Sequence, residues 1–164
     1  MSTSVSMIVI ATLVLGTANP SRAEGNAAPL KVRLCDLHEH PEQYAGKMVE
    51  VRARIVGRDD PTLDDFSKPP CSTFSVIALT FPHELRADAP FELEKNSSLR
   101  EYDAARGKPM GIEATIQGRF DSIIVQQDGD RARAGKGYGK KSKFESRLVV
   151  RELKDVFTWR MPKK

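Results

Sequence analysis

The sequence predicts a mainly β domain with one or two short helices. Two segments, 48–56 and 112–120, alternate apolar and polar residues with the period of a half-buried strand. Between them, residues 90–106 carry apolar side chains at helical spacing and are followed by Gly107-Lys108-Pro109, which ends a helix. Strands on both sides of one main helix therefore define the expected class.

Two further strands complete the expected sheet. Residues 74–81 are apolar in both phases, which is typical of a strand buried on both faces. The last strand is expected over 148–159, with a bend near Glu152 because its alternation slips there. Its two aromatic residues, Phe157 and Trp159, are expected in the core or closing the barrel, and a ligand platform is the alternative.

The remaining segments are expected to be brief helices or loops. A short helix is predicted over 36–44, with Asp36 as a candidate N-cap. Residues 24–30 form a flexible leader, and the acidic stretch 59–70 is expected to be a loop. A glycine- and lysine-rich loop is expected over 131–143, after the Asp-Gly-Asp turn signal.

A short internal repeat links the two alternating strands. The string Val-x-Ala-x-Ile-x-Gly-Arg at 51–58 returns as Ile-x-Ala-x-Ile-x-Gly-Arg at 112–119. Half-buried strands that end in glycine can converge on such strings. Alternatively, both strands hold equivalent places in a barrel, each with a glycine where the sheet coils sharply. Coiled strands with a helix late in the chain favour a five-stranded OB-like Greek-key barrel.

Several motifs are spread along residues 32–157. They are Pro41-x-x-Tyr44-x-Gly46-Lys47-x-Val49-x-Val51, Cys71 ahead of Ile77-Ala78-Leu79, Ile116-x-Gly118-Arg119-Phe120, and the glycine loop before Leu148-Val149-Val150. Together they resemble small exported bacterial proteins with an OB-fold-like domain, mostly of unknown function. The resemblance implies a fold and a compartment and carries no catalytic residues. The loop of that group often holds a histidine, where this chain has Lys136 and Tyr138.

The first 23 residues are expected to be a signal peptide. Residues 7–16 form an apolar run of about ten residues, too short for a hydrocarbon core of about 30 Å and typical of a secretory signal. Small side chains place cleavage after Ala23, with Ala18 as the alternative. An uncleaved anchor or a buried helix is the competing interpretation. The mature chain, 24–164, is then one periplasmic or secreted domain without a membrane span.

Two cysteines remain after the expected cleavage, Cys35 and Cys71. An even count in an oxidising compartment predicts one disulfide between them. A chain-entropy estimate for a loop of this length gives about 3–4 kcal/mol of stabilisation. Two free thiols, one of them reactive, are the alternative.

Three histidines are weak candidates for metal ligands. His38 and His40 would share a face in an extended segment, with His83 as a third ligand. On a helix, His38 and His40 point in different directions and are expected to be ordinary surface residues. The chain has no P-loop, EF-hand or nucleophile-elbow motif, so no cofactor is expected.

Positive charge is concentrated at the end of the chain. Residues 131–164 hold twelve Lys and Arg against three acidic residues, a net charge of +9, whereas residues 24–130 carry −6. A basic loop and a basic C-terminal tail attract polyanions, and OB-like barrels bind oligonucleotides or oligosaccharides. The candidate binding residues are Arg131, Arg133, Lys136, Tyr138, Lys140, Lys141 and Lys143. Tyr138 is a candidate for stacking on a ligand ring, and a merely solvated loop is the competing interpretation.

The sequence therefore predicts a non-catalytic binding or accessory module of the cell envelope. Its expected partner is an envelope polyanion, such as lipopolysaccharide or an acidic glycan, contacted through the basic loop. A structural or protein-interaction subunit with an inert loop, bound to an envelope protein, is the first alternative. A metal-dependent hydrolase that uses His38, His40 and His83 is the second.

Overall fold

A computed structural model describes residues 28–65, 71, 76–85, 89–127, 130–133 and 135–161. The expected signal peptide, 1–23, lies outside these residues. The same holds for the end of the basic tail, 162–164.

The described part of the chain is mainly β, as predicted, with three α-helices instead of one or two. In chain order the elements are β1 (Leu30–Lys31), α1 (Leu34–Glu39), α2 (Pro41–Tyr44), β2 (Met48–Val56), β3 (Thr62–Asp64), β4 (Ile77–Thr80), the 3-10 turn η2 (Pro82–Glu84), α3 (Ser97–Ala105), β5 (Met110–Ser122), β6 (Ile124–Gln127), β7 (Asp130–Arg133), the 3-10 turn η4 (Lys140–Ser142) and β8 (Ser146–Arg160).

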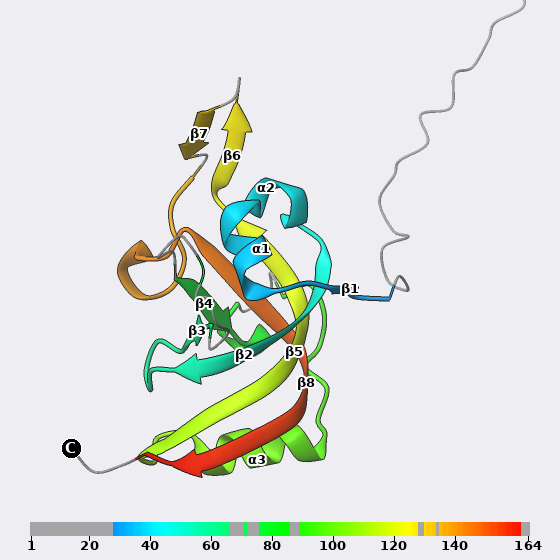
Figure 1. The fold of residues 1–164 in the computed structure, drawn as a ribbon, viewed down its shortest axis with the longest axis vertical. Helices are drawn as coiled ribbons and strands as arrows, with labels where there is room; N and C mark the ends of the chain where they lie inside the picture. Colours follow the sequence, from blue (N-terminus) through cyan, green and yellow to red (C-terminus); the bar gives the residue numbers. More distant parts are fainter. Residues whose placement is uncertain are drawn as a thin grey trace, which may run out of the picture.

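Six strands form one sheet in the order β1-β2-β3-β4-β8-β5, and β2 also pairs with β5. The pairing therefore returns to its start. Strands β3, β4, β8 and β5 each have two hydrogen-bonded neighbours, and β2 has three, because β1 also pairs with it. Strand β8 runs parallel to β4, and β1 runs parallel to β2, while the other pairs of the sheet are antiparallel. Strands β6 and β7 form a separate hairpin, which projects at the opposite end of the molecule from α3 (Figure 1).

The two repeated strings pair directly with each other. Val51 lies opposite Ile116, Ala53 opposite Ala114 and Ile55 opposite Ile112, and all six side chains are buried. Both strings therefore encode a strand with one buried face. The two glycines are required for different reasons. Gly57 has a positive φ of 89° in the turn after β2, whereas a Cβ at Gly118 would lie 2.2 Å from the Val149 carbonyl oxygen.

The bend predicted near Glu152 is confirmed. Gln117 pairs with Glu152 and Gly118 with Val150, so Arg151 is an extra residue in β8 and forms a bulge. A second register shift lies opposite Glu113 and Thr115, where Asp155 adopts a positive φ of 47°. The two bulges explain why the alternation slips in the sequence.

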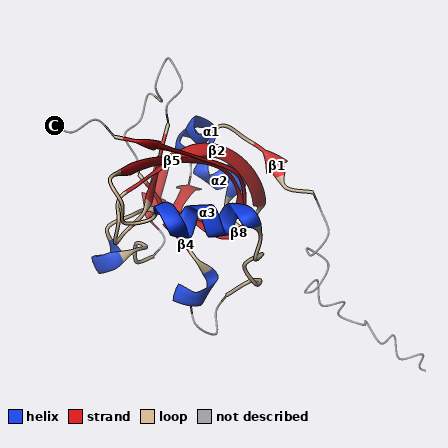
Figure 2. Ribbon diagram, turned by 90° about the horizontal axis from the view of Figure 1, so that it is seen from below, coloured by secondary structure: helices blue, strands red, loops and turns tan. Residues whose placement is uncertain are grey.

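The helices cover the sheet at different places. Helix α3 packs along β8 and β5, and α1 with α2 lies at another part of the sheet (Figure 2). The side-chain oxygen of Asn96 caps α3 by accepting from the Leu99 amide at 2.8 Å. Residues 90–95, expected to be helical, precede this cap and are not. No helix among the described residues is long and apolar enough to cross a bilayer.

Other local predictions were wrong. Helix α1 begins at Leu34, so Asp36 is not its N-cap. Instead the Asp36 carboxylate accepts from the Arg33 amide at 3.1 Å and from its guanidinium at 2.6 Å. The hydrogen bond from Arg33 lowers the pKa of Asp36 below its usual value. Strand β3 lies in the expected acidic loop, and β7 occupies the start of the expected basic loop.

Candidate functional site

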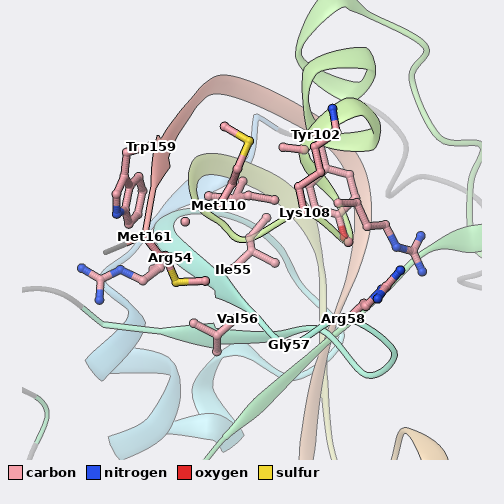
Figure 3. Close-up of a pocket in the computed structure, with 15 residues that line it drawn as sticks. Arg54, Ile55, Val56, Gly57, Arg58, Tyr102, Lys108, Met110, Trp159 and Met161 are labelled. Carbon is pink, nitrogen blue, oxygen red and sulfur yellow. The ribbon is translucent and has the colours of Figure 1, made fainter. Parts of the chain in front are cut away.

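A cavity of about 630 Å³ lies where four segments meet. The end of β2, the C-terminal end of α3, the start of β5 and the end of β8 each contribute to its lining. In Figure 3, Trp159 and Arg54 lie on one side of it, and Tyr102, Lys108 and Arg58 lie on the other. We refer to it as the α3 pocket.

The wall of the α3 pocket is largely apolar. Its apolar residues are Ile55, Val56, Tyr102, Ala105, Met110, Ile112, Trp159 and Met161. Tyr102 is 2% exposed, and burial raises its pKa to about 12, so the hydroxyl stays neutral at physiological pH. This apolar part of the wall thus offers an uncharged surface to the body of a ligand.

Four cations share this pocket: Arg54, Arg58, Arg106 and Lys108. Among the described residues that line it, none is a carboxylate, a histidine or a cysteine. The Arg54 guanidinium lies 5.5 Å from the centre of the Trp159 ring and 3.8 Å from Asp64 outside the pocket. An anion in the pocket would therefore meet several positive charges beside apolar surface.

A glycine makes room for the aromatic wall. A Cβ built at Gly111 would lie 2.2 Å from two carbon atoms of the Trp159 ring, so the indole packs directly on the backbone of β5. Phe157 stacks on Trp159 with ring centres 6.0 Å apart and is 59% exposed. The expectation that both aromatic residues are in the core was wrong: β8 runs past the core, and its end lines the pocket instead.

The sequence-predicted basic loop has a different setting. Lys136, Lys140, Lys141 and Lys143 are exposed. Arg131 and Arg133 lie in β7, with side chains outside the described residues. A smaller cavity of about 330 Å³ near the loop is lined by Lys140 and Arg147, but also by the carboxylates of Asp59, Asp60 and Glu84. The positive charge of the loop is therefore interleaved with negative charge there.

Tyr138, the candidate stacking residue, is half-buried in the loop. The Arg147 guanidinium lies 4.5 Å from the centre of its ring, so one partner of the ring is already supplied by β8. Its backbone bridges to Phe144, and burial raises the pKa of its hydroxyl. The ring thus helps to hold the loop on the sheet.

The three histidines are not brought together as ligands among the described residues. His38 is 7% exposed, contrary to the expected surface position, because α1 packs this face inward; burial lowers its pKa. His40 is exposed and lies 3.9 Å from Glu42, and His83 stacks on Phe81 at 5.9 Å. The geometry gives no support to a site built from these three residues.

The predicted disulfide is confirmed. Cys35 and Cys71 are bonded, with their Cα atoms 5.1 Å apart. The bond ties α1 to the segment between β3 and β4. The Asp65 carboxylate lies beside both sulfur atoms.

Sequence reasoning missed the α3 pocket. Arg54 alternates with the buried residues of its strand and is half-buried, but this alternation says nothing of its neighbours. Gly111 within a strand was the one local signal, because an interior strand glycine often marks a close approach of another group. Nothing in the sequence shows that Trp159 is that group.

No family model matches the chain, and no curated protein matches it significantly. Among solved structures, the chain is similar to a crystal structure described as that of an aspartyl-tRNA synthetase from Leishmania major Friedlin. The two are 14% identical with a TM-score of 0.36, over 87% of this chain and 22% of the other. A similarity this low supports no functional argument.

Proposed function

We propose that this protein is a non-catalytic, exported envelope module that binds an amphipathic anion in the α3 pocket. The observation that carries the proposal is the joint presence of an apolar wall and four cations, without a carboxylate, in one cavity. Ligand sites are typically concave and mostly apolar, with a few polar groups that fix orientation. An acyl or aryl body with an acidic head matches both parts.

The fold assignment within this proposal is an OB-like barrel. Its support is the ring of pairing through β2, β3, β4, β8 and β5, with β4–β8 as the parallel pair and α3 between β4 and β5. The resemblance to small exported OB-like proteins remains part of the proposal. Export is also part of the proposal, and the disulfide is compatible with it.

The energetics favour a ligand with an apolar tail. Each methylene removed from water contributes about 0.8 kcal/mol, so about eight carbons contribute roughly 6 kcal/mol before the cost of association. Partly exposed ion pairs add up to about 1 kcal/mol each. The apolar tail therefore supplies most of the favourable free energy, and the ion pairs add a smaller part.

Binding fits the pocket better than catalysis does. Histidine or a carboxylate carries general acid–base chemistry most often, although lysine, tyrosine and cysteine can also serve. The described pocket residues offer cations, apolar groups and a neutral tyrosine instead. Among envelope anions, lipopolysaccharide and anionic phospholipids carry acyl chains beside acidic groups and fit better than a plain acidic glycan.

The test uses Trp159, the single tryptophan of the chain, as an internal reporter. Dodecyl phosphate is titrated into the purified protein while the tryptophan emission is followed. We expect saturable binding near micromolar concentration, much weaker binding of dodecanol, and none of dodecyltrimethylammonium. Equal responses to all three would show that the charge of the ligand is irrelevant and would refute the proposal.

Matched variants separate the pocket from the basic loop. Arg58→Gln with Lys108→Gln removes two charges from the pocket, and Lys140→Gln with Lys141→Gln removes two from the loop. We expect the first pair to raise the Kd about tenfold, since two partly exposed ion pairs contribute roughly 1–2 kcal/mol. The loop pair should leave it unchanged. The opposite ranking would return the ligand site to the loop.

A further inference from the structure

Two sulfur atoms and one carboxylate oxygen form a compact cluster that the α3 pocket does not include. Cys35 lies in α1, Asp65 follows β3 directly, and Cys71 lies between β3 and β4. Asp65 Oδ2 lies 3.0 Å from Cys35 Sγ and 3.1 Å from Cys71 Sγ. All three residues are half-buried.

The chemistry of the disulfide state does not account for these contacts. A disulfide sulfur carries no proton, so it donates nothing to the carboxylate at these distances. The three atoms are all electron-rich, and their close approach brings lone pairs together. In the reduced state the same three atoms become two thiols or thiolates and a carboxylate, which attract a proton or a cation.

We propose that the reduced protein binds a divalent metal ion of the zinc or cobalt type through Cys35, Cys71 and Asp65. Thiolate sulfur and carboxylate oxygen are common zinc ligands, and two thiolates disfavour hard ions such as Mg²⁺ and Ca²⁺. Three protein ligands leave a fourth position for water or for another side chain. This proposal is independent of ligand binding in the α3 pocket.

His38 is a candidate for the fourth position. It follows Cys35 by three residues, so both side chains lie on one side of the same helical turn. It is 7% exposed, and the charge of Asp65 acts to raise its pKa against the dominant lowering by burial. The imidazole therefore interacts electrostatically with Asp65, and a metal ion would bind its neutral form.

The required rearrangement is small. Tetrahedral zinc with Zn–S bonds of about 2.3 Å holds two sulfur atoms about 3.8 Å apart. The two Cα atoms are already 5.1 Å apart, so the sulfurs can separate by side-chain rotation once their bond is broken. Asp65 already faces both sulfurs and needs only to move back slightly.

Disulfide and metal complex exclude each other, since both use the same sulfurs. A dithiol reductant supplies two electrons and two protons to the S–S bond, yields two thiols and itself becomes a disulfide. The metal ion then replaces both thiol protons, which pass to solvent, and the Asp65 carboxylate completes three anionic ligands. Metal uptake is therefore controlled by the redox state.

Cobalt(II) serves as the probe. The purified protein is reduced with excess dithiothreitol, freed of reductant under nitrogen and titrated with Co²⁺. We expect a thiolate-to-cobalt charge-transfer band in the near ultraviolet, with one ion per chain, which Zn²⁺ then abolishes. The oxidised protein should show no band, and a reduced protein without one would overturn the proposal.

Asp65→Asn and Asp64→Asn form a matched pair. Asp64 is the exposed neighbour on β3 and does not touch the sulfurs. Loss of the Asp65 ligand should weaken Co²⁺ binding at least about tenfold, while Asp64→Asn binds as the parent does. Equal affinity of the two variants would remove Asp65 from the site. Circular dichroism of the reduced forms establishes that each variant is folded.

Discussion

The basic loop and the α3 pocket both gather cations, but they differ in what surrounds the charge. The lysines of the loop are exposed, and the cavity beside Lys140 is also lined by three carboxylates. Three of the four cations of the pocket are exposed as well, but they share a cavity with apolar side chains and with no carboxylate among its described lining residues. The basic loop can therefore be found from the density of Lys and Arg along the sequence. The α3 pocket can be found only from the side chains that surround its cations in the structure.

The difference follows from screening and desolvation. An exposed lysine interacts through water and is screened within about 8–10 Å at physiological salt. A cation beside apolar surface acts on a ligand that is partly removed from water, where its interaction is stronger. Three substitutions at the pocket, each compared with one in the loop, test whether the pocket is the more desolvated region and the one that binds the ligand.

The largest effect is expected from Gly111→Ala, because the new Cβ would overlap the Trp159 ring. The indole must leave its place on β5, and overpacking of this kind costs about 1–3 kcal/mol. We expect this loss in urea unfolding, a change in tryptophan emission and at least a tenfold weaker binding of dodecyl phosphate.

Gly135→Ala in the basic loop is the matched control. Its Cβ would lie 3.8 Å from Ile123, an ordinary contact, at a backbone conformation without positive φ. The free energy of unfolding should change by less than about 0.5 kcal/mol. If both variants behave alike, the packing of Trp159 on Gly111 does not shape the pocket.

An intermediate effect is expected at alkaline pH from Tyr102. Burial raises its folded-state pKa to about 12, whereas the unfolded chain ionises near 10. Its contribution is therefore complete below pH 10 and is lost as the pH rises towards 12. At pH 11 the loss is about 1 kcal/mol.

Tyr102→Phe should remove that part of the alkaline decline in the free energy of unfolding, measured by urea titration from pH 9 to 11. Tyr138→Phe in the loop is the comparison. The Tyr138 pKa is raised in the same direction, but the ring is only half-buried, so a smaller correction is expected. A larger correction from Tyr138 would show that the loop is the more desolvated region.

The smallest effect is expected at Phe157 of the pocket, and Tyr138 of the loop is its comparison. Phe157 stacks on Trp159 at the pocket and is 59% exposed, so Phe157→Ser should change stability by less than about 0.5 kcal/mol. It should weaken binding of dodecyl phosphate about threefold, because apolar surface beside the ligand is lost. Tyr138→Ser should leave this affinity unchanged, and a loss there would place the loop at the ligand.

The strands with a buried face were predictable from sequence. The alternation of apolar and polar residues predicted β2 with its observed bounds, Met48–Val56. A shift of the pairing by one residue would expose Val51, Ala53 and Ile55, so the pattern also determines which face is buried. The slipped alternation near Glu152 likewise marked a real bulge. In both cases the local pattern and the final packing agree.

Other features have no local signal. Strand β3 is three residues long and exists because β2 and β4 pair with it on both sides. His38 is buried by the packing of α1, which the residue type does not encode. The pocket joins Arg54, Tyr102, Gly111 and Trp159 from four segments, so only the tertiary structure brings them together.

The position of β8 has a consequence for when the chain can fold. This last strand lies between β4 and β5, so before its 15 residues emerge both of those strands present an unpaired edge. The contacts that close the ring are also distant in sequence, and such contacts form slowly. The ring of strand pairing therefore cannot close until β8 has been synthesised.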